Sequence, residues 1–405
     1  MTSATTAPDT AVTATQRIHG LDALRAGALG LGIVLHSLMP FLSEAVWLFN
    51  DRRTTPVAGA VVDWIHLFRM VLFMALAGYF GRMVLQRRGT ARYLKDRLLR
   101  IGLPAVAFWP VAVASTFAIV GVGMAMRGQE LPPAAESAEA DPLLLFTPAH
   151  LWFLWVLIEA VLITVLARAV LLRVLGDAAV GRAAERIGQA LSSPWGVLVA
   201  VPPYAACLLA QGSTVAGIRE HATIVPSVTA LTAYLGAFLV GWFLQARAGS
   251  LHWIARYWPV QLALAVVLTV ALRMLTDAAA PLLVLATTTA LGGWTWTFAL
   301  IGLSVRFLYR ERPVVRYLAD ASYWSYLLHL PILLAVGLAL ADTGLPIIVK
   351  LVITWVVTGA LLLGSYDLFV RSTWIGRWLN GYRHPRAWQR MRRSREVDDH
   401  AVSRS

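Results

Sequence analysis

Long apolar runs dominate the sequence, and each is about 20 residues long, which is the length that an α-helix needs to cross a bilayer. Hydrophobic residues make up 58% of the chain and charged residues 14%, against roughly 25% charged residues in a soluble domain. This composition excludes a water-soluble or disordered chain, and the single Cys207 excludes a disulfide scaffold. Ten apolar runs can be distinguished: 21–42, 64–85, 101–126, 150–175, 194–211, 227–245, 257–275, 282–308, 321–341 and 347–370. The sequence therefore predicts an all-α integral membrane protein, a bundle of about ten transmembrane helices.

Basic residues are distributed unevenly between the two sets of segments that connect these runs. With ten spans both termini lie on one side, and the segments on that side carry 23 Lys and Arg residues, against 4 on the other side. Because positive residues favour the cytoplasmic side, we expect both termini in the cytoplasm of a multi-pass protein of the inner or plasma membrane. The same rule accounts for the net charge of +13 without nucleic acid as a partner.

Three regions follow from this division. Residues 1–20 are rich in Thr and Ala and lack the apolar core of a cleavable signal peptide, so we expect a disordered polar leader. Residues 21–370 form the transmembrane domain, and residues 371–405 form a basic cytoplasmic tail that is solvated or touches lipid headgroups.

The first apolar run carries two ionisable residues, Arg25 and His36, eleven positions apart. Eleven residues are close to three helical turns, so both side chains share one face, about 16 Å apart along the axis. Asp22, one turn before Arg25, can pair with it. Arg25 can also be a snorkelling anchor and His36 a buried packing residue, but a neutral imidazole is the usual group for removing a proton from a hydroxyl.

The helix of the second run carries Asp63, His66 and Arg69 at spacings of three, and we expect them on one face near its outer end. Arg69 is too deep to snorkel easily, so it requires either an ion pair with Asp63 or Glu159 or a polar cavity that meets the His36 region. Glu159 in the fourth run is expected near mid-membrane, where a lone carboxylate needs a partner. On the inner side, Arg97 and Arg100 lead into the third run, and two guanidinium groups one turn apart suit phosphate as well as topology.

Polar and aromatic residues also occur in the fourth and ninth runs. His150 and Trp152 stand at the outer mouth of the fourth run, where an aromatic belt is the alternative interpretation of Trp152. The ninth run carries Tyr323 and His329, and His329 shares a polar stripe with two serines that can serve helix–helix hydrogen bonds instead. Cys207 lies in an apolar run, where packing is the better interpretation.

Five landmarks resemble the acyltransferase-3 family of integral-membrane O-acyltransferases. In chain order they are Arg25-x10-His36 after Leu21–Leu24, the stretch Phe68–Phe80, Arg97-x-x-Arg100, His150–Leu154 and Ser322–Pro331. The Phe-Arg-Met and His-Leu-Trp-Phe-Leu variants look closest to the glucan biosynthesis protein C branch, which is associated with succinylation of periplasmic glucans. One departure is Ala77-Gly78, where the family often has Ser-Gly, so a step that depends on that serine is not expected here.

The resemblance implies transfer of an acyl group, acetyl or succinyl, from cytoplasmic acyl-CoA to a hydroxyl of an extracytoplasmic glycan, glycolipid or other envelope acceptor. His36 would act as general base or transient acyl carrier, with Arg25 and Glu159 as further catalytic candidates. Arg97 and Arg100 would bind the CoA phosphates. The residues expected to line the substrate path are Asp63, His66, Arg69, His150, Trp152, Tyr323 and His329.

No cofactor beyond acyl-CoA as co-substrate is expected, and no metal is suggested, because the histidines lack an H-x-x-x-H or H-E-x-x-H spacing. A secondary transporter also has about ten helices with buried charges and breaks such as Pro202-Pro203. It should show two matching halves, and residues 1–200 and 201–370 do not match convincingly. An envelope-assembly membrane protein without catalysis is the other alternative, and it needs no general base.

Overall fold

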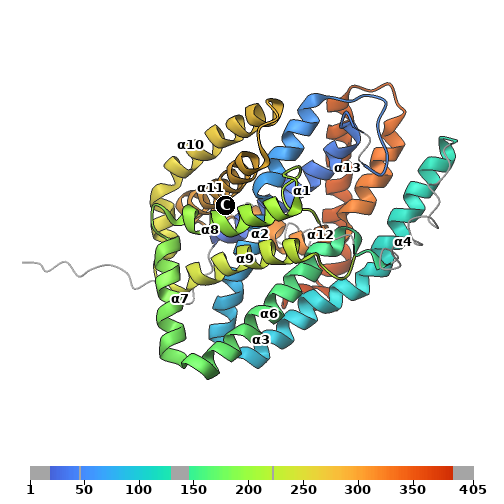
Figure 1. Ribbon diagram of the computed structural model, residues 1–405. Coiled ribbons are helices and arrows are strands. Elements are labelled where there is room, and N and C mark those ends of the chain that lie inside the picture. Colours follow the sequence, from blue (N-terminus) through green and yellow to red (C-terminus); the bar gives the residue numbers. More distant parts are fainter. Residues whose placement is uncertain (1–18, 45–46, 129–145, 221–222, 386–405) are drawn as a thin grey trace, which may run out of the picture.

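The computed structural model describes residues 19–44, 47–128, 146–220 and 223–385, and these residues form helices joined by short loops (Figure 1). Within these ranges there is no β-strand, which confirms the predicted all-α class. The main helices are α1 (His19–Leu38), α2 (Pro56–Arg88), α3 (Thr90–Arg97), α4 (Leu103–Met126), α6 (Trp152–Leu175), α7 (Asp177–Leu191), α8 (Gly196–Gln211), α9 (Val228–Ala246), α10 (Ser250–Asp277), α11 (Leu282–Phe307), α12 (Pro313–Ala341), α13 (Ile347–Ser365) and α14 (Trp374–Asn380). Two short 3-10 helices are η1 (Met39–Phe41) and η4 (Ala149–Leu151). Two short π-helical turns are η2 (Leu98–Gly102) and η5 (Tyr366–Val370).

Nine helical stretches in the described part of the chain are long and apolar enough to span a membrane. The pair α7 and α8 passes the same test together but is bent by 97°. With 16 residues, α8 is about 24 Å long, short of the roughly 30 Å hydrocarbon core. The predicted bundle of about ten spans is confirmed, while the run at 194–211, expected as a simple span, belongs to this bent pair, which has the form of a broken span or a re-entrant loop.

Several helices begin earlier than the apolar runs indicate, because capping and proline fix their starts. The side chain of Thr55 accepts a hydrogen bond from the Val57 backbone N–H, and Pro56 occupies the first turn of α2, where its missing N–H costs nothing. Helix α9, which Ser227 caps by accepting from the Ala230 N–H, begins within one residue of the start of its apolar run.

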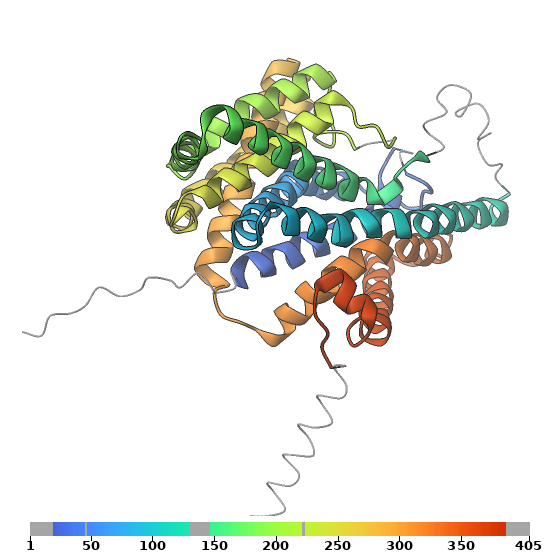
Figure 2. The same cartoon turned by 90° about the horizontal axis from the view of Figure 1, so that it is seen from below.

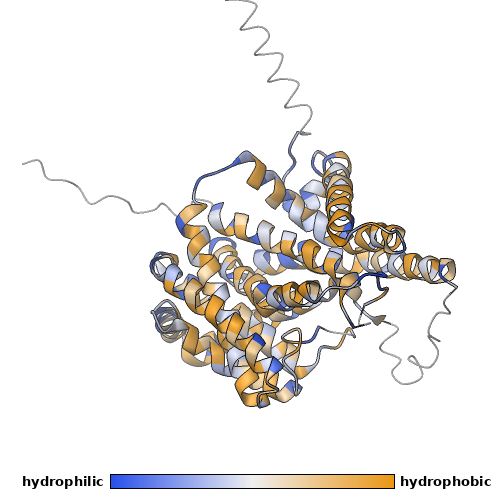
Figure 3. Ribbon diagram, turned by 90° about the horizontal axis from the view of Figure 1, so that it is seen from above, coloured by the Kyte–Doolittle hydropathy of each residue, from blue (hydrophilic) through white to orange (hydrophobic). Residues whose placement is uncertain are grey.

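Helices α2 and α9 form the tightest contact in the centre of the bundle. A Cβ on Gly78 of α2 would collide with the Phe238 carbonyl of α9, and a Cβ on Gly241 of α9 would collide with the Ala75 carbonyl of α2. Small residues at such positions let helix backbones approach closely. The outer helices expose apolar side chains, among them Val267 of α10, and Figure 3 shows apolar residues in orange along most of their length. This outer surface suits lipid contact.

The C-terminal part of the fold extends past residue 370. Helix α14, drawn in red in Figure 2, packs against α12, and the Trp378 indole donates a hydrogen bond of 2.7 Å to the Leu99 carbonyl. The Tyr382 hydroxyl donates to the Asp320 carboxylate at 2.6 Å. Residues 371–385 of the predicted tail are thus part of the helical fold, while residues 386–405 and residues 1–18 of the predicted leader lie outside the described residues.

The two ends of the bundle differ in chemistry. We call the end that carries Arg25, Arg97 and Arg100 the basic end, and the end that carries His150 and Glu220 the loop end. Helix α1 begins at the basic end, and α14 also lies there, since Gly381, directly after α14, contacts the Arg100 guanidinium. Both ends of the described chain therefore lie at the basic end, whose position in the cytoplasm stays a prediction.

Candidate active site

A cavity of about 1840 Å³ lies inside the bundle and is lined by residues of both ends. Its walls come from α1, α2, α4, α6 and α12, with η2 and α14 at the basic end and the loop after α8 at the loop end. Pockets for one small molecule are typically about 300–1,000 Å³. The cavity therefore has room for more than one reactant.

Ten of the twelve residues expected at the site line this cavity. They are Arg25, His36, His66, Arg69, Arg97, Arg100, His150, Trp152, Tyr323 and His329. Arg25 and His36 project from the same side of α1, as the eleven-residue spacing predicts. Arg25 also pairs with Asp22 at 3.7 Å. The arrangement places a guanidinium near one end of the cavity and an imidazole deep inside it.

The His36 ring contacts two other rings. The Trp47 indole stacks on it with a centroid distance of 5.6 Å and an interplanar angle of 22°. The His329 imidazole of α12 lies on it at 5.4 Å, and His150 in turn contacts His329 at 5.4 Å. Three imidazoles from three different elements are therefore linked by two successive ring contacts along the cavity wall.

Hydrogen bonds to backbone carbonyls fix which ring nitrogen carries the proton in these histidines, because a carbonyl oxygen only accepts. His329 places Nδ1 at 2.8 Å from the Tyr326 carbonyl, and His66 places Nδ1 at 3.1 Å from the Val62 carbonyl. In the neutral rings the lone pair is then on Nε2. His150 is the reverse, since its Nε2 donates to the Leu327 carbonyl at 3.1 Å. His36 Nδ1 is buried and has no hydrogen-bond partner among the described residues.

Arg69 lies in the cavity wall beside α1. Its guanidinium fills the space where Gly32 has no side chain, because a Cβ there would collide with Nη1. No carboxylate of a described residue forms an ion pair with it, and the nearest acidic influence is Glu220 of the loop after α8. A buried cation without a close ion pair is available to a substrate or a developing oxyanion.

Glu220 is a further cavity residue, and no sequence pattern singled it out. Its side chain has accessible surface because it faces the cavity. Burial from bulk solvent raises the pKa of the Glu220 carboxyl, while the charge of Arg69 and a hydrogen bond from Trp152 oppose that rise. The loop is held by Tyr234, whose hydroxyl donates to the Ile218 carbonyl at 2.8 Å. Glu220 is therefore presented by an anchored loop.

The basic end holds its arginines around one carboxylate. Asp96 lies 3.3 Å from Arg88 Nη1, 3.7 Å from Arg97 Nη2 and 3.3 Å from Arg100 Nε. Arg97 also lies over the Tyr93 ring at 5.3 Å. Three guanidinium groups around a single carboxylate leave an excess of positive charge, so an anionic group that enters this mouth is attracted.

The widened turn η2 explains how Arg100 is held. In a π-type turn the regular α-helical hydrogen bonds are interrupted, which leaves carbonyls for other donors. The Tyr323 hydroxyl donates to the Arg100 carbonyl at 2.7 Å, and the Trp378 indole N–H donates to the Leu99 carbonyl. Tyr323, expected on the substrate path, thus lines the cavity and also positions the arginine turn.

Asp63 and Glu159 do not line the cavity, which differs from the expected placement. Each three-residue step on a helix rotates by about 300°, so Asp63 lies about 120° around α2 from Arg69, and it interacts electrostatically with Arg273 of α10 instead. Glu159 lies two residues, about 200°, after the cavity-lining Leu157, and its Oε2 has no hydrogen-bond partner among the described residues. The ion pair between Arg69 and Asp63 or Glu159 is therefore absent from the described structure.

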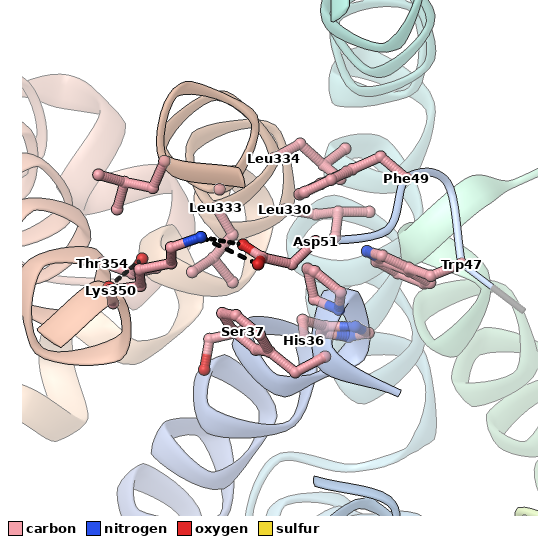
Figure 4. Close-up of a pocket in the computed structure, with 14 residues that line it drawn as sticks. His36, Ser37, Trp47, Phe49, Asp51, Leu330, Leu333, Leu334, Lys350 and Thr354 are labelled. Carbon is pink, nitrogen blue, oxygen red and sulfur yellow. Dashed lines mark hydrogen bonds and ion pairs between the residues drawn. The ribbon is translucent and has the colours of Figure 1, made fainter. Parts of the chain in front are cut away.

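A buried ion pair behind His36 was also missed. Lys350 of α13 and Asp51 of the loop before α2 line a small second pocket together with His36 and Trp47 (Figure 4). Lys350 is one of two lysines in the chain and lies inside an apolar run. An ionisable residue within such a run signals function or pairing, so its position alone gave a usable indication. Asp51 gave none, because it lies in a loop of ordinary polarity.

Ala77, which stands where the family often has serine, lines the cavity. Its methyl group offers no hydrogen bond at that point of the wall. Among the described residues no group of three or more His, Cys, Asp or Glu side chains has the geometry to hold a metal ion. The polar side chains that line the cavity include imidazole, guanidinium, carboxylate and phenol groups.

Comparison with known proteins connects this cavity to a family. The model of the acyltransferase-3 family, described as an acyltransferase domain, matches residues 18–370. The chain is 29% identical over 143 residues to the glucans biosynthesis protein C of Escherichia coli (strain K12) and of Shigella boydii serotype 4 (strain Sb227).

These two alignments cover 35% of this chain and 37% of each relative, so the chain matches about a third of the length of these curated proteins. No solved structure matches the fold. The family match, in contrast, covers nearly the whole transmembrane domain, and the bundle has the spanning helices of a multi-pass membrane protein. The chain therefore belongs to the acyltransferase-3 family.

Proposed function

We propose that this membrane acyltransferase moves an acetyl or succinyl group from cytoplasmic acyl-CoA to a hydroxyl of an extracytoplasmic glycan or other envelope acceptor. The observation that carries the proposal is that His36 and the arginines of the basic end line one cavity. The match to relatives named glucans biosynthesis protein C supports a glycan as the acceptor.

The donor enters at the basic end in this proposal. Arg97 and Arg100, with Arg25, bind the CoA phosphates through charge-assisted hydrogen bonds. The acyl-pantetheine arm then extends along α1, which separates Arg25 from His36 by about 16 Å. The thioester reaches the ring cluster of His36 and His329, where the cavity wall changes from charged to aromatic.

The acceptor enters from the loop end. His66, His150 and Trp152 line this half of the cavity, together with Glu220. Their donors and acceptors suit a hydroxyl-rich ligand, because ring nitrogens and a carboxylate accept hydroxyl hydrogens and an indole face packs on a sugar ring.

His36 acts as general base in the transfer step. A ring nitrogen takes the proton of the acceptor hydroxyl, and the oxygen attacks the thioester carbonyl carbon. Arg69 stabilises the oxyanion of the tetrahedral intermediate. The intermediate collapses with cleavage of the C–S bond, and the proton on His36 passes to the departing thiolate to give free CoA. No atom or electron beyond the two substrates is needed.

The decisive test is mass spectrometry of envelope glycans and lipids from cells that express the wild-type protein or His36→Ala. The proposal expects a mass shift of an acetyl or succinyl group on one envelope component in the wild type and its absence in the variant. The two proteins must reach the membrane in equal amounts, which an immunoblot of the membrane fraction checks. An unchanged acylation pattern in the variant contradicts the role of His36, and no acyl-CoA consumption by the wild type favours transport instead.

A further inference from the structure

The loop between α1 and α2 is fastened to the bundle by a buried ion pair. Lys350 Nζ lies 2.9 Å from Asp51 Oδ1 and 2.6 Å from Asp51 Oδ2, and it also donates to the Ala341 carbonyl at 3.0 Å. The two side chains are 1% and 2% exposed. Asp51 and Lys350 are 299 positions apart in the sequence, so the pair joins α13 to a distant loop.

The pair satisfies its hydrogen-bonding capacity on both sides. Asp51 Oδ1 also accepts from the Arg53 backbone N–H at 2.9 Å. All three Lys350 ammonium hydrogens have acceptors, because two carboxylate oxygens and one carbonyl surround Nζ. Burying two charges is costly even when they are well paired, and an apolar pair of similar size is often at least as stable. Stability alone is therefore a weak explanation for this pair.

The same loop carries Trp47 onto the His36 ring. Backbone bonds of 2.9 Å from the Asp51 N–H to the Pro40 carbonyl and from the Thr55 N–H to the Phe41 carbonyl close the loop. Between these closures Trp47 stacks on the His36 imidazole, which also contacts the His329 ring at a tilt of 44°. Figure 4 shows the ion pair, Trp47 and His36 around one small pocket.

His36 itself lacks the hydrogen bond that orients the other histidines. Its Nδ1 has no partner among the described residues, whereas His329, His150 and His66 each bond a backbone carbonyl. A general base usually needs a neighbour that fixes its ring. For His36 the available neighbours are the two flanking rings, and one of them belongs to the fastened loop.

We infer that Asp51, Lys350 and Trp47 are positioning residues: the ion pair holds the loop so that Trp47 clamps the His36 ring in the orientation used for catalysis. This inference rests on the proposed role of His36 as base. An error of about 1 Å in the placement of a reacting group can cost about 100-fold in rate. Loss of the clamp should therefore lower kcat more than it alters KM for acyl-CoA, whose phosphate site lies at the other end of the cavity.

The test uses the full-length protein in lipid nanodiscs and two variants that avoid an unpaired buried charge. The double variant Asp51→Leu with Lys350→Met replaces the pair by apolar residues, and Trp47→Ala removes the clamping ring. Trp47→Phe is the conservative rescue, because it keeps a ring that can stack. Asp277→Asn is the matched control, since it breaks an exposed ion pair with Arg273 of α10 without touching the buried pair or the loop.

Two readouts separate this inference from the proposed function. The first is the rate at which diethylpyrocarbonate modifies His36, measured by peptide mass spectrometry, which does not depend on any activity. We expect faster modification by about 10-fold in the double variant and in Trp47→Ala, and wild-type rates in Trp47→Phe and Asp277→Asn. The second is acyl transfer from acetyl-CoA or succinyl-CoA, where kcat should fall about 10-fold to 100-fold with KM changed less than about twofold.

The possible outcomes are distinct. Unchanged His36 modification in the double variant and in Trp47→Ala overturns the clamp, whatever the activity. Faster modification without loss of transfer shows that His36 orientation is irrelevant to the reaction, which also overturns the inference. Faster modification in these variants, together with a wild-type protein that transfers no acyl group, keeps the clamp and rejects the proposed function.

Discussion

The imidazole rings of His36 on α1 and His329 on α12 lie 5.4 Å apart, in the wall of a cavity that also reaches the arginines of the basic end. His329 donates its Nδ1–H to the Tyr326 carbonyl, which leaves Nε2 as the proton-accepting nitrogen. Two bases from distant parts of the chain thus share one site. Their contact connects the first-helix motif to the polar stripe of the ninth predicted run.

This contact gives the first prediction. His329→Asn keeps an N–H that can reach the Tyr326 carbonyl but lacks the second ring nitrogen, whereas His329→Leu lacks both. If His329 acts as an acid or base in acyl transfer, both variants should lose about 100-fold in kcat, the size of a typical acid–base contribution. Steady-state rates of acyl transfer measure this. Near-normal activity of His329→Asn with an inactive His329→Leu would assign His329 a packing role instead.

The arginine cluster gives the second prediction. Arg97→Gln or Arg100→Gln should raise KM for acyl-CoA about 10-fold or more with little change in kcat, because a hydrogen bond to a charged group is worth about 1.5–3 kcal/mol and is made equally in ground and transition states. Arg92→Gln is the matched control, as Arg92 is exposed on the same stretch of chain and does not line the cavity. Equal effects of all three substitutions would mean that only the overall positive charge matters.

Two glycines of α1 give the third prediction. A Cβ on Gly32 would displace the Arg69 guanidinium, whereas a Cβ on Gly30 meets nothing within 4 Å. Gly32→Ala should therefore lower kcat while the protein stays folded, because the flexible end of Arg69 can move aside. Gly30→Ala should keep wild-type kcat, and thermal unfolding of both variants checks the fold. Wild-type activity of Gly32→Ala would contradict a catalytic role for the Arg69 position.

Glu220 gives the fourth prediction, which concerns pH. Burial raises the pKa of its carboxyl, so the group takes up a proton at a higher pH than an ordinary glutamate as the pH falls. Protonation removes the negative charge that faces Arg69, and acceptor-dependent kcat/KM should fall on the acid side. Glu220→Gln should behave at every pH like the wild type at low pH. Glu44→Gln should keep the wild-type profile, because the Glu44 side chain is exposed and does not line the cavity. A fall of kcat/KM at low pH that persists in Glu220→Gln would contradict this role of the Glu220 carboxyl.

Helical periodicity and apolar length were sufficient for much of this account. They predicted the all-α bundle and the shared face of Arg25 and His36, because both depend on local geometry. The same reasoning placed Asp63 wrongly, since repeated spacings of three drift around the helix. The bend between α7 and α8 was missed because the hydropathy pattern does not record a 97° turn.

The residues that hold the site together could not be found in this way. Lys350 meets Asp51 across 299 positions, and Trp47 reaches His36 through a loop. Such contacts depend on how α12 and α13 pack beside α1, which no local pattern encodes. The single usable signal was the lysine inside an apolar run.

The most direct measurement is release of free CoA by the purified protein in lipid nanodiscs, supplied with acetyl-CoA or succinyl-CoA and an extract of envelope glycans. The account predicts CoA release that depends on the extract, with the acyl group recovered on a glycan hydroxyl, and a loss of both in His36→Ala at equal protein. CoA release and glycan acylation that continue unchanged in His36→Ala would contradict it.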